Sequence, residues 1–218
     1  MTSTSQESHP ITVVPATTEH WTDIQVLFAN TPCWCQYYRV TSSEYGRSSR
    51  DQLFEHWLAE RKEALHRQLE GETPPGVLAY LGDTIVGWCG IGVRAEMGRL
   101  VRSRTIPKVD DRPVWSIVCF LVRPGYRRRG VARVLLRGAI ETARSFSAPA
   151  LEAYPVDPSE QPGNKPIHTS AAYVGTIAMF EQEGFQRVTQ TTATSAGLTR
   201  WLVRLDLARS ESVQQPHH

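Results

Sequence analysis

The chain has 218 residues, of which 40% are hydrophobic and 21% are charged, and its formal net charge is +2. A chain of this length can bury a sizeable core as one large domain or two small ones. The near-neutral balance argues against the broad basic field that nucleic-acid-binding proteins usually carry. The sequence contains no apolar run of about 18 residues and no basic-then-apolar leader. We therefore expect a cytoplasmic protein that binds neither nucleic acid nor membrane.

Changes in hydrophobic period divide the chain into a disordered N-terminal segment (1–10), one domain (11–207) and a disordered C-terminal tail (208–218). Residues 95–113 are expected to form a loop-like insertion. The nearly continuous apolar run at 114–122 predicts a central strand. The alternation of strands and helices predicts a single α/β domain with a mixed sheet. The predicted elements are a strand (11–16), helices (17–30 and 49–71), two strands around a Gly-Asp turn (76–94), a strand (114–122), a helix (129–146), a strand (150–156), a helix (173–183) and two strands (185–190 and 199–207).

Four cysteines are spread too unevenly to form the disulfide framework of a small secreted domain. Cys33 and Cys35 form a C-x-C pair, which is only half of a zinc site, and no second Cys or His pair follows at metal spacing. We therefore expect free thiols and no metal. Cys119 lies in an apolar strand without a histidine nearby in the sequence, which favours an inert core thiol over a nucleophile.

The stretch "FLVRPGYRRRGVARVLL" (120–136) concentrates arginine between a predicted buried strand and an amphipathic helix. A helix N-terminus offers unpaired N–H groups and a partial positive charge to an anion. Gly130 lets the backbone approach a ligand closely, and arginines nearby add charge-assisted hydrogen bonds to phosphate. The spacing of Arg127, Gly130 and Ala132 matches neither the G-x-G-x-x-G nor the Walker pattern, so dinucleotide redox chemistry and nucleotide hydrolysis lose support. The stretch predicts a site for a diphosphate.

The same residues resemble the acetyl-CoA-binding motif of GCN5-related N-acetyltransferases (GNAT), in which Arg or Gln is followed by two residues, Gly, one residue, and Gly or Ala. Val122 and Pro124 match the strand end that precedes this motif, and "MFEQEGF" (179–185) resembles the family's second cofactor segment. The resemblance implies a mixed, mostly antiparallel sheet flanked by helices, with a splayed central strand pair. It also implies transfer of an acetyl group from acetyl-CoA to an amine that attacks directly in a ternary complex.

The resemblance assigns the cofactor contacts residue by residue. The strand end would present its backbone to the pantetheine arm, the turn would hold the pyrophosphate through its N–H groups, and two residues of the later helix would flank the end of the arm. A backbone N–H of the first strand would stabilise the oxyanion. The residues concerned are Phe120, Leu121, Val122, Arg127, Arg128, Arg129, Gly130, Val131, Ala132, Thr176 and Phe180.

The pattern of the family breaks at Phe180, where a tyrosine commonly protonates the departing thiolate. A thiol has a pKa of about 8.5, so the thiolate is a tolerable leaving group without that donor. Tyr173, the second catalytic candidate, lies seven residues earlier on the predicted helix, about 10 Å up its axis, which is too far to substitute directly for a hydroxyl at position 180. We interpret it as lining the cofactor groove or the acceptor channel, with core packing as the alternative. Glu152 is the candidate base, with a surface carboxylate as the alternative, and Asp157 is a second candidate.

The acceptor side is predicted to involve the aromatic loop at 31–49 and neighbouring strands. Trp34, Tyr37, Trp88 and Tyr154 are the candidate acceptor-binding residues, with a small aromatic core as the alternative, and "CWC" (33–35) can pack against "WCG" (88–90). The basic residues of 99–113 can recruit an acidic acceptor, or form a solvated loop or a homodimer contact.

The acceptor amine itself is not identified by the sequence: an antibiotic, a polyamine, an amino acid or a protein amine all fit. The competing reading is a non-catalytic acyl-CoA-binding or interaction module of the same fold, which Phe180 favours. A nucleic-acid binder that uses the arginine stretch is a third, weaker reading.

Overall fold

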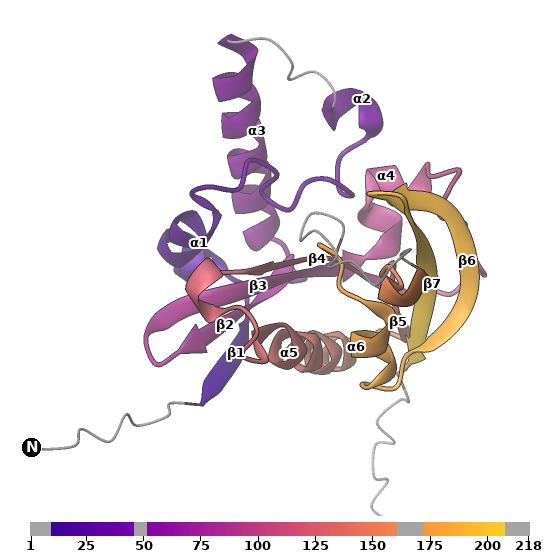
Figure 1. The fold of residues 1–218 in the computed structure, drawn as a ribbon. Coiled ribbons are helices and arrows are strands. Elements are labelled where there is room, and N and C mark those ends of the chain that lie inside the picture. Colours follow the sequence, from indigo (N-terminus) through magenta and orange to yellow (C-terminus); the bar gives the residue numbers. More distant parts are fainter. Residues whose placement is uncertain (1–9, 46–51, 161–171, 208–218) are drawn as a thin grey trace, which may run out of the picture.

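The computed structural model describes residues 10–45, 52–160 and 172–207, so the two predicted disordered ends lie almost wholly outside the described residues. One sheet with the strand order β1-β2-β3-β4-β5-β7-β6 organises the domain (Figure 1). Only β4 and β5 pair in parallel, and every other neighbouring pair is antiparallel, as predicted for the fold. The strands are β1 (Ile11–Pro15), β2 (Gly76–Leu81), β3 (Thr84–Val93), β4 (Trp115–Val122), β5 (Ala150–Ala153), β6 (Gln186–Ser195) and β7 (Leu198–Asp206).

Helices cover both faces of this sheet (Figure 1). The long helix α5 packs against β1, β2, β3 and β4 on one face, and α1 packs against β3 on the other. Within the described ranges, no helix has both the length and the apolar character needed to cross a membrane. The helices are α1 (Trp21–Phe28), α2 (Ser42–Tyr45), α3 (Gln52–Leu69), α4 (Gly98–Val101), α5 (Val131–Ser145) and α6 (Ile177–Glu181).

Several elements differ from the sequence prediction, and three of the differences lie close to the site. The helix predicted over 173–183 begins only at Ile177, because Gly175 has a φ of +91° and Thr176 is extended. The predicted helix over 129–146 begins at Val131, after a left-handed Gly130. The insertion at 95–113, predicted as a loop, contains α4.

The face of α5 that meets the sheet is apolar at helical spacing. Val131, Leu135 and Ala139 lie one turn apart and are buried, as an amphipathic helix on a sheet requires. Gly138 permits the close approach, since a Cβ there would stand 2.3 Å from the Val13 side chain of β1. The position of α5 fixes where its N-terminus meets the end of β4.

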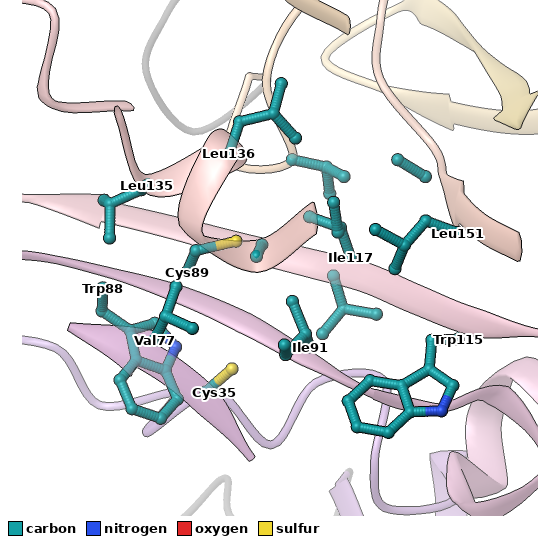
Figure 2. Close-up of a cluster of buried hydrophobic side chains, with 14 of the residues drawn as sticks. Cys35, Val77, Trp88, Cys89, Ile91, Trp115, Ile117, Leu135, Leu136 and Leu151 are labelled. Carbon is teal, nitrogen blue, oxygen red and sulfur yellow. The ribbon is translucent and has the colours of Figure 1, made fainter. Parts of the chain in front are cut away.

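Alternation along β3 sends neighbouring side chains to opposite faces of the sheet. Figure 2 shows Cys89 on the side of Leu135 and Leu136 from α5, and Trp88 on the other side beside Cys35. The predicted contact between the two cysteine–tryptophan stretches is therefore confirmed. The contact between Cys35 and Trp88 closes the core beneath the aromatic loop that precedes α2.

Candidate active site

The parallel strands β4 and β5 are paired only over the first three residues of β4. Their register ends at Ile117 and Ala153, whereas β4 continues to Val122. The pairing of β4 with β3 shifts at the same level, where Val118 is an extra residue, and such a bulge bends a strand. The two strands therefore part, which confirms the predicted splayed pair.

A segment that precedes α6 enters the gap between these strands. The backbone N–H of Phe120 donates to the C=O of Tyr173 at 2.6 Å, and the N–H of Val156 donates to the C=O of Gly175 at 3.4 Å. The segment is thereby fixed to both sides of the gap. Tyr173, predicted on a helix, instead lies in a turn before α6, which the N–H of Gly175 closes by donating to the C=O of Ala172 at 2.7 Å.

A cavity of about 840 Å³, here called the cofactor groove, runs along the end of β4 and the start of α5. Its other wall includes Gly175 and Met179 next to Tyr173. These two were not predicted, because the expected helix put other residues there. The predicted cofactor residues that line the groove are Phe120, Leu121, Val122, Arg127, Arg128, Gly130, Val131 and Ala132.

The turn before α5 has the backbone geometry of an anion site. Gly130 has a φ of +81° and Arg128 a φ of +61°, so the chain curves sharply here. The first full helical bond runs from the N–H of Val134 to the C=O of Gly130. The N–H groups of Val131 and Ala132 precede it and have no acceptor within the helix. With the helix dipole, they form a site that favours negative charge.

Arginine side chains around the turn have different tasks. Arg127 donates through Nε to the C=O of Val122 at 3.1 Å and so ties the turn to β4. Arg133 and Arg137 both donate to Glu183, at 2.6 and 2.9 Å, and hold its pKa below the ordinary value, chiefly through Arg137. Arg129, predicted to bind the cofactor, is not part of the groove wall; its guanidinium lies 5.8 Å from the ring of Tyr126.

Two predicted contacts to the pantetheine end do not line the groove. Phe180 is fully buried, with ring centroids 6.2 Å from Phe120 and 5.0 Å from Phe185. Thr176 is the N-cap residue of α6. Because α6 begins four residues later than predicted, Met179 takes the lining position that was assigned to Phe180.

A second cavity of about 770 Å³, here called the acceptor cavity, is formed by three parts of the chain that are distant in sequence. Its walls are the aromatic loop before α2, the insertion around α4, and the β6–β7 hairpin, which lie on one side of the molecule (Figure 1). Backbone bonds tie them together: Arg99 N–H donates to Tyr38 C=O at 3.1 Å, and Thr192 N–H donates to Thr105 C=O at 3.2 Å.

Tyr173 lines both cavities and so forms their common wall. Its hydroxyl donates to the hydroxyl of Tyr38 at 3.2 Å, and the guanidinium of Arg200 lies 4.6 Å from its ring. Burial raises the pKa of Tyr173 well above its ordinary value, so its hydroxyl keeps its proton at neutral pH. Of the aromatic acceptor candidates, Tyr37 also lines the acceptor cavity.

Three other predicted acceptor residues are core residues instead. Trp34 stacks on Phe28, and Trp88 is completely buried between the sheet and the loop. Tyr154 is also completely buried, and its hydroxyl lies 2.9 Å from that of Ser116. The alternative reading of an aromatic core therefore holds for these three.

Glu152, the predicted base, lines neither cavity and is only 1% exposed. Arg204 donates to one of its carboxylate oxygens at 2.5 Å, and Arg94 lies 3.5 Å from the other. The Tyr154 hydroxyl donates to that second oxygen at 3.3 Å. Both carboxylate oxygens are thus engaged by partners, and Glu152 links β5 to β7 and to Arg94 after β3. Asp157 likewise pairs with Arg187 at 3.0 Å.

The cysteines adjoin the groove without forming a metal site. Cys33 and Cys119 line the cofactor groove, and Cys35 is buried behind them, hydrogen-bonded to Cys119. That bond and burial raise the pKa of Cys119 well above the ordinary value, which fits an inert thiol. In the part of the chain that the structure describes, no three His, Cys, Asp or Glu side chains are placed to hold a metal ion.

Sequence reasoning missed the β6–β7 contribution to the acceptor cavity. The strand was predicted to end at residue 190, whereas β6 continues to Ser195, and Thr192, Thr194 and Arg200 line the cavity. The run of threonines is a β signal, but nothing local shows that this hairpin folds over the insertion.

Comparison with known proteins agrees with this geometry. A family model described as the acetyltransferase (GNAT) family matches residues 34–165, which is more than half of the chain. The chain therefore belongs to the GNAT acetyltransferase family. No curated protein sequence matches the chain.

Solved structures of the same fold cover nearly the whole domain. A ribosomal-protein-alanine N-acetyltransferase from Brucella melitensis has a TM-score of 0.52 at 16% identity, covering 90% of this chain and 99% of its own. A GNAT-family acetyltransferase from Streptococcus pneumoniae has a TM-score of 0.52 at 15% identity, covering 91% and 100%. At such identities the likeness establishes the fold.

Proposed function

We propose that this protein transfers the acetyl group of acetyl-CoA to an amine nitrogen by direct attack in a ternary complex. The observation that carries the proposal is the shared wall of the two cavities. Tyr173 faces the cofactor groove on one side and the acceptor cavity on the other, at the gap between β4 and β5. A thioester in the groove and an amine in the acceptor cavity would meet there, so the two reactants are held together without a covalent acyl-enzyme.

The groove supplies matched contacts along coenzyme A. The N–H groups of Val131 and Ala132 would hold the pyrophosphate, and the apolar end of β4 would carry the pantetheine arm. The N–H of Phe120 is already bonded to Tyr173. Residues two apart on a strand present their backbone groups to the same side, so we assign the N–H of Val122 to a carbonyl oxygen of the pantetheine–thioester chain.

Proton transfer is assigned to Tyr173 and to solvent. The amine lone pair forms the N–C bond, the C–S bond breaks, and the Tyr173 hydroxyl gives its proton to the departing thiolate. The phenolate regains a proton, through water, from the nitrogen of the new amide. A general acid must be protonated beforehand, and burial, which raises the pKa of Tyr173, keeps this hydroxyl protonated at neutral pH.

The acceptor cavity itself would favour a reactive amine. Its described lining contains arginines and no carboxylate. Positive charge nearby disfavours an ammonium and lowers its pKa, so more of the bound amine is neutral. This effect takes the place of the base that Glu152 does not provide.

The test is release of the coenzyme A thiol from acetyl-CoA across a panel of amines. Tyr173→Phe should lower kcat by about 100-fold while keeping acetyl-CoA affinity, because it removes only the proton donor. Tyr80→Phe is the matched control and should keep full turnover. It removes the hydroxyl of a tyrosine on β2, which donates to Asp23 of α1. Binding of acetyl-CoA without thiol release on any amine would instead support the acyl-CoA-binding module.

A further inference from the structure

We propose that the acceptor carries an oxyanion, a carboxylate or a phosphate, which the arginines of the acceptor cavity bind. This inference rests on the proposed function, because it assigns the acceptor to the cavity next to Tyr173. The amine would lie beside Tyr173, and the anionic group would point toward the insertion around α4.

The lining of the cavity has one sign of charge. Four guanidinium groups face it, and no aspartate or glutamate does so among the described residues. Hydroxyls of serine and threonine complete the polar wall; they carry no charge and can accept or donate hydrogen bonds. The guanidinium groups belong to Arg99, Arg102, Arg104 and Arg200.

The cations of the insertion that do not line the cavity, and Arg94 just before it, are paired with carboxylates. Arg94 pairs with Glu152, Lys108 with Asp111 at 2.5 Å, and Arg112 with Asp206 at 2.6 Å. The side chains of Arg99, Arg102 and Arg104 line the cavity and have no such ion pair within the described residues. The contrast separates a binding wall from an ordinary solvated loop.

Arg102 and Arg104 are exposed, and their side chains have neither a hydrogen-bond nor an ion-pair partner within the described ranges. Arg99 packs its guanidinium 4.3 Å from the ring of Tyr37, and its buried Nε has no hydrogen-bond acceptor there. Aromatic stacking fixes the plane of a guanidinium and leaves its edge available for a bidentate anion. Arg99 is thus held in an orientation that suits an anion, and the side chains of Arg102 and Arg104 are available to bind one.

Arg200 sets the inner end of the site. Its Nη1 donates to the C=O of Tyr154 at 2.6 Å, and its guanidinium lies over Tyr173. It is therefore a fixed positive charge at the reaction centre, whereas Arg102 and Arg104 are the anion-binding pair at the rim. A molecule that fits has its amine and its anionic group at opposite ends.

Matched pairs of amines distinguish this inference from a neutral-acceptor enzyme. We expect kcat/KM to be at least about tenfold higher for O-phosphoethanolamine than for ethanolamine, and for glutamate than for glutamine, since charge-assisted bonds are the stronger ones. Dipeptides that begin Ala-Glu and Ala-Gln form a further arm, which tells a free small molecule from the acidic N-terminus of a peptide. Added salt should reduce the preference.

The variant Arg102→Gln/Arg104→Gln should raise KM for the anionic member of each pair by about tenfold and leave the neutral member unchanged. Lys108→Gln lies on the same insertion and lines neither cavity, so it is the matched control and should keep the preference. Equal use of charged and neutral acceptors, or an equal loss for both in the double variant, would overturn the inference.

A binding measurement separates this inference from the proposed function. Calorimetry with O-phosphoethanolamine and with glutamate, added to the protein saturated with coenzyme A, needs no turnover. Binding that the double variant loses and Lys108→Gln keeps supports the anion site even if no acetyl group is transferred, in which case only the proposed function fails. Absence of binding of both ligands to the native protein refutes the anion site.

Discussion

Gly130 and Gly197 form a matched pair that separates backbone strain from cofactor contact. Both have a φ of +81°, and at both positions a Cβ would meet nothing within 4 Å. Gly130 precedes α5 and lines the cofactor groove, whereas Gly197 lies in the turn between β6 and β7 and lines neither cavity. Substituting each by alanine therefore adds the same strain in two different places.

The expected energies follow from the two settings. A non-glycine residue in the left-handed region costs about 1–2 kcal/mol, so each variant should lose about that much stability, or roughly 2–8 °C in Tm for a chain of this size. Only at Gly130 would the methyl group stand where the pyrophosphate approaches the backbone. We expect Gly130→Ala to weaken acetyl-CoA binding by about tenfold or more, which corresponds to about 1.4 kcal/mol.

Thermal unfolding and calorimetry with acetyl-CoA measure the two effects separately. Gly197→Ala should share the stability loss and keep the affinity. Arg133→Gln should weaken binding less than Gly130→Ala, because the Arg133 side chain is engaged with Glu183. Native affinity in Gly130→Ala, or an equal loss in Gly197→Ala, would show that the backbone of this turn does not bind the cofactor.

Three further predictions concern stability. Glu152→Gln should cost about 3–5 kcal/mol in urea unfolding, because it leaves Arg204 and Arg94 without their buried partner; Glu181→Gln, which breaks a half-exposed pair, should cost within about 1 kcal/mol. A kcat loss of about 100-fold in folded Glu152→Gln would restore its role as base. The pKa of Glu183 is lowered from 4.5, so its contribution to stability is present above that value and is lost as pH falls through the lower folded-state pKa; Glu183→Gln should flatten the pH dependence of unfolding in that acid window, and an unchanged acid limb would contradict the pairing. Gly138→Ala should destabilise the protein by about 1–3 kcal/mol through contact with Val13, and Val13→Ala should relieve part of that loss; simple additivity of the two would refute the contact.

The position of the turn around Gly130 depends on the local backbone and could be predicted from the sequence, although the helix was predicted to begin at Arg129. In the structure Gly130 is the N-cap residue of α5 and has a left-handed φ of +81°. The groove lining from Phe120 to Ala132 followed from that order of elements. Such features are encoded within a dozen residues, where hydrophobic period and glycine position act directly on the chain.

Residues whose role depends on what packs against them were predicted poorly. Glu152 and Tyr154 lie on the same side of the chain, as predicted, but the sequence does not show that Arg94 and Arg204 surround them. Tyr173 was placed on a helix because its neighbours are apolar. In the structure Tyr173 lies before the helix. Its segment is hydrogen-bonded to Phe120 of β4 and to Val156 after β5, and the left-handed Gly175 interrupts the helical backbone.

The sequence by itself determined the α/β order of elements and the turn at Gly130, because strand and helix periods and a glycine after arginines are properties of neighbouring residues. The splayed strand pair was expected from the family resemblance. Only the tertiary structure decided that Tyr173 separates two cavities and that the arginines of the insertion face one of them. The acceptor cavity joins the aromatic loop, the insertion and the β6–β7 hairpin. Contacts among segments so far apart in the chain arise from packing of the whole domain, which no local pattern contains.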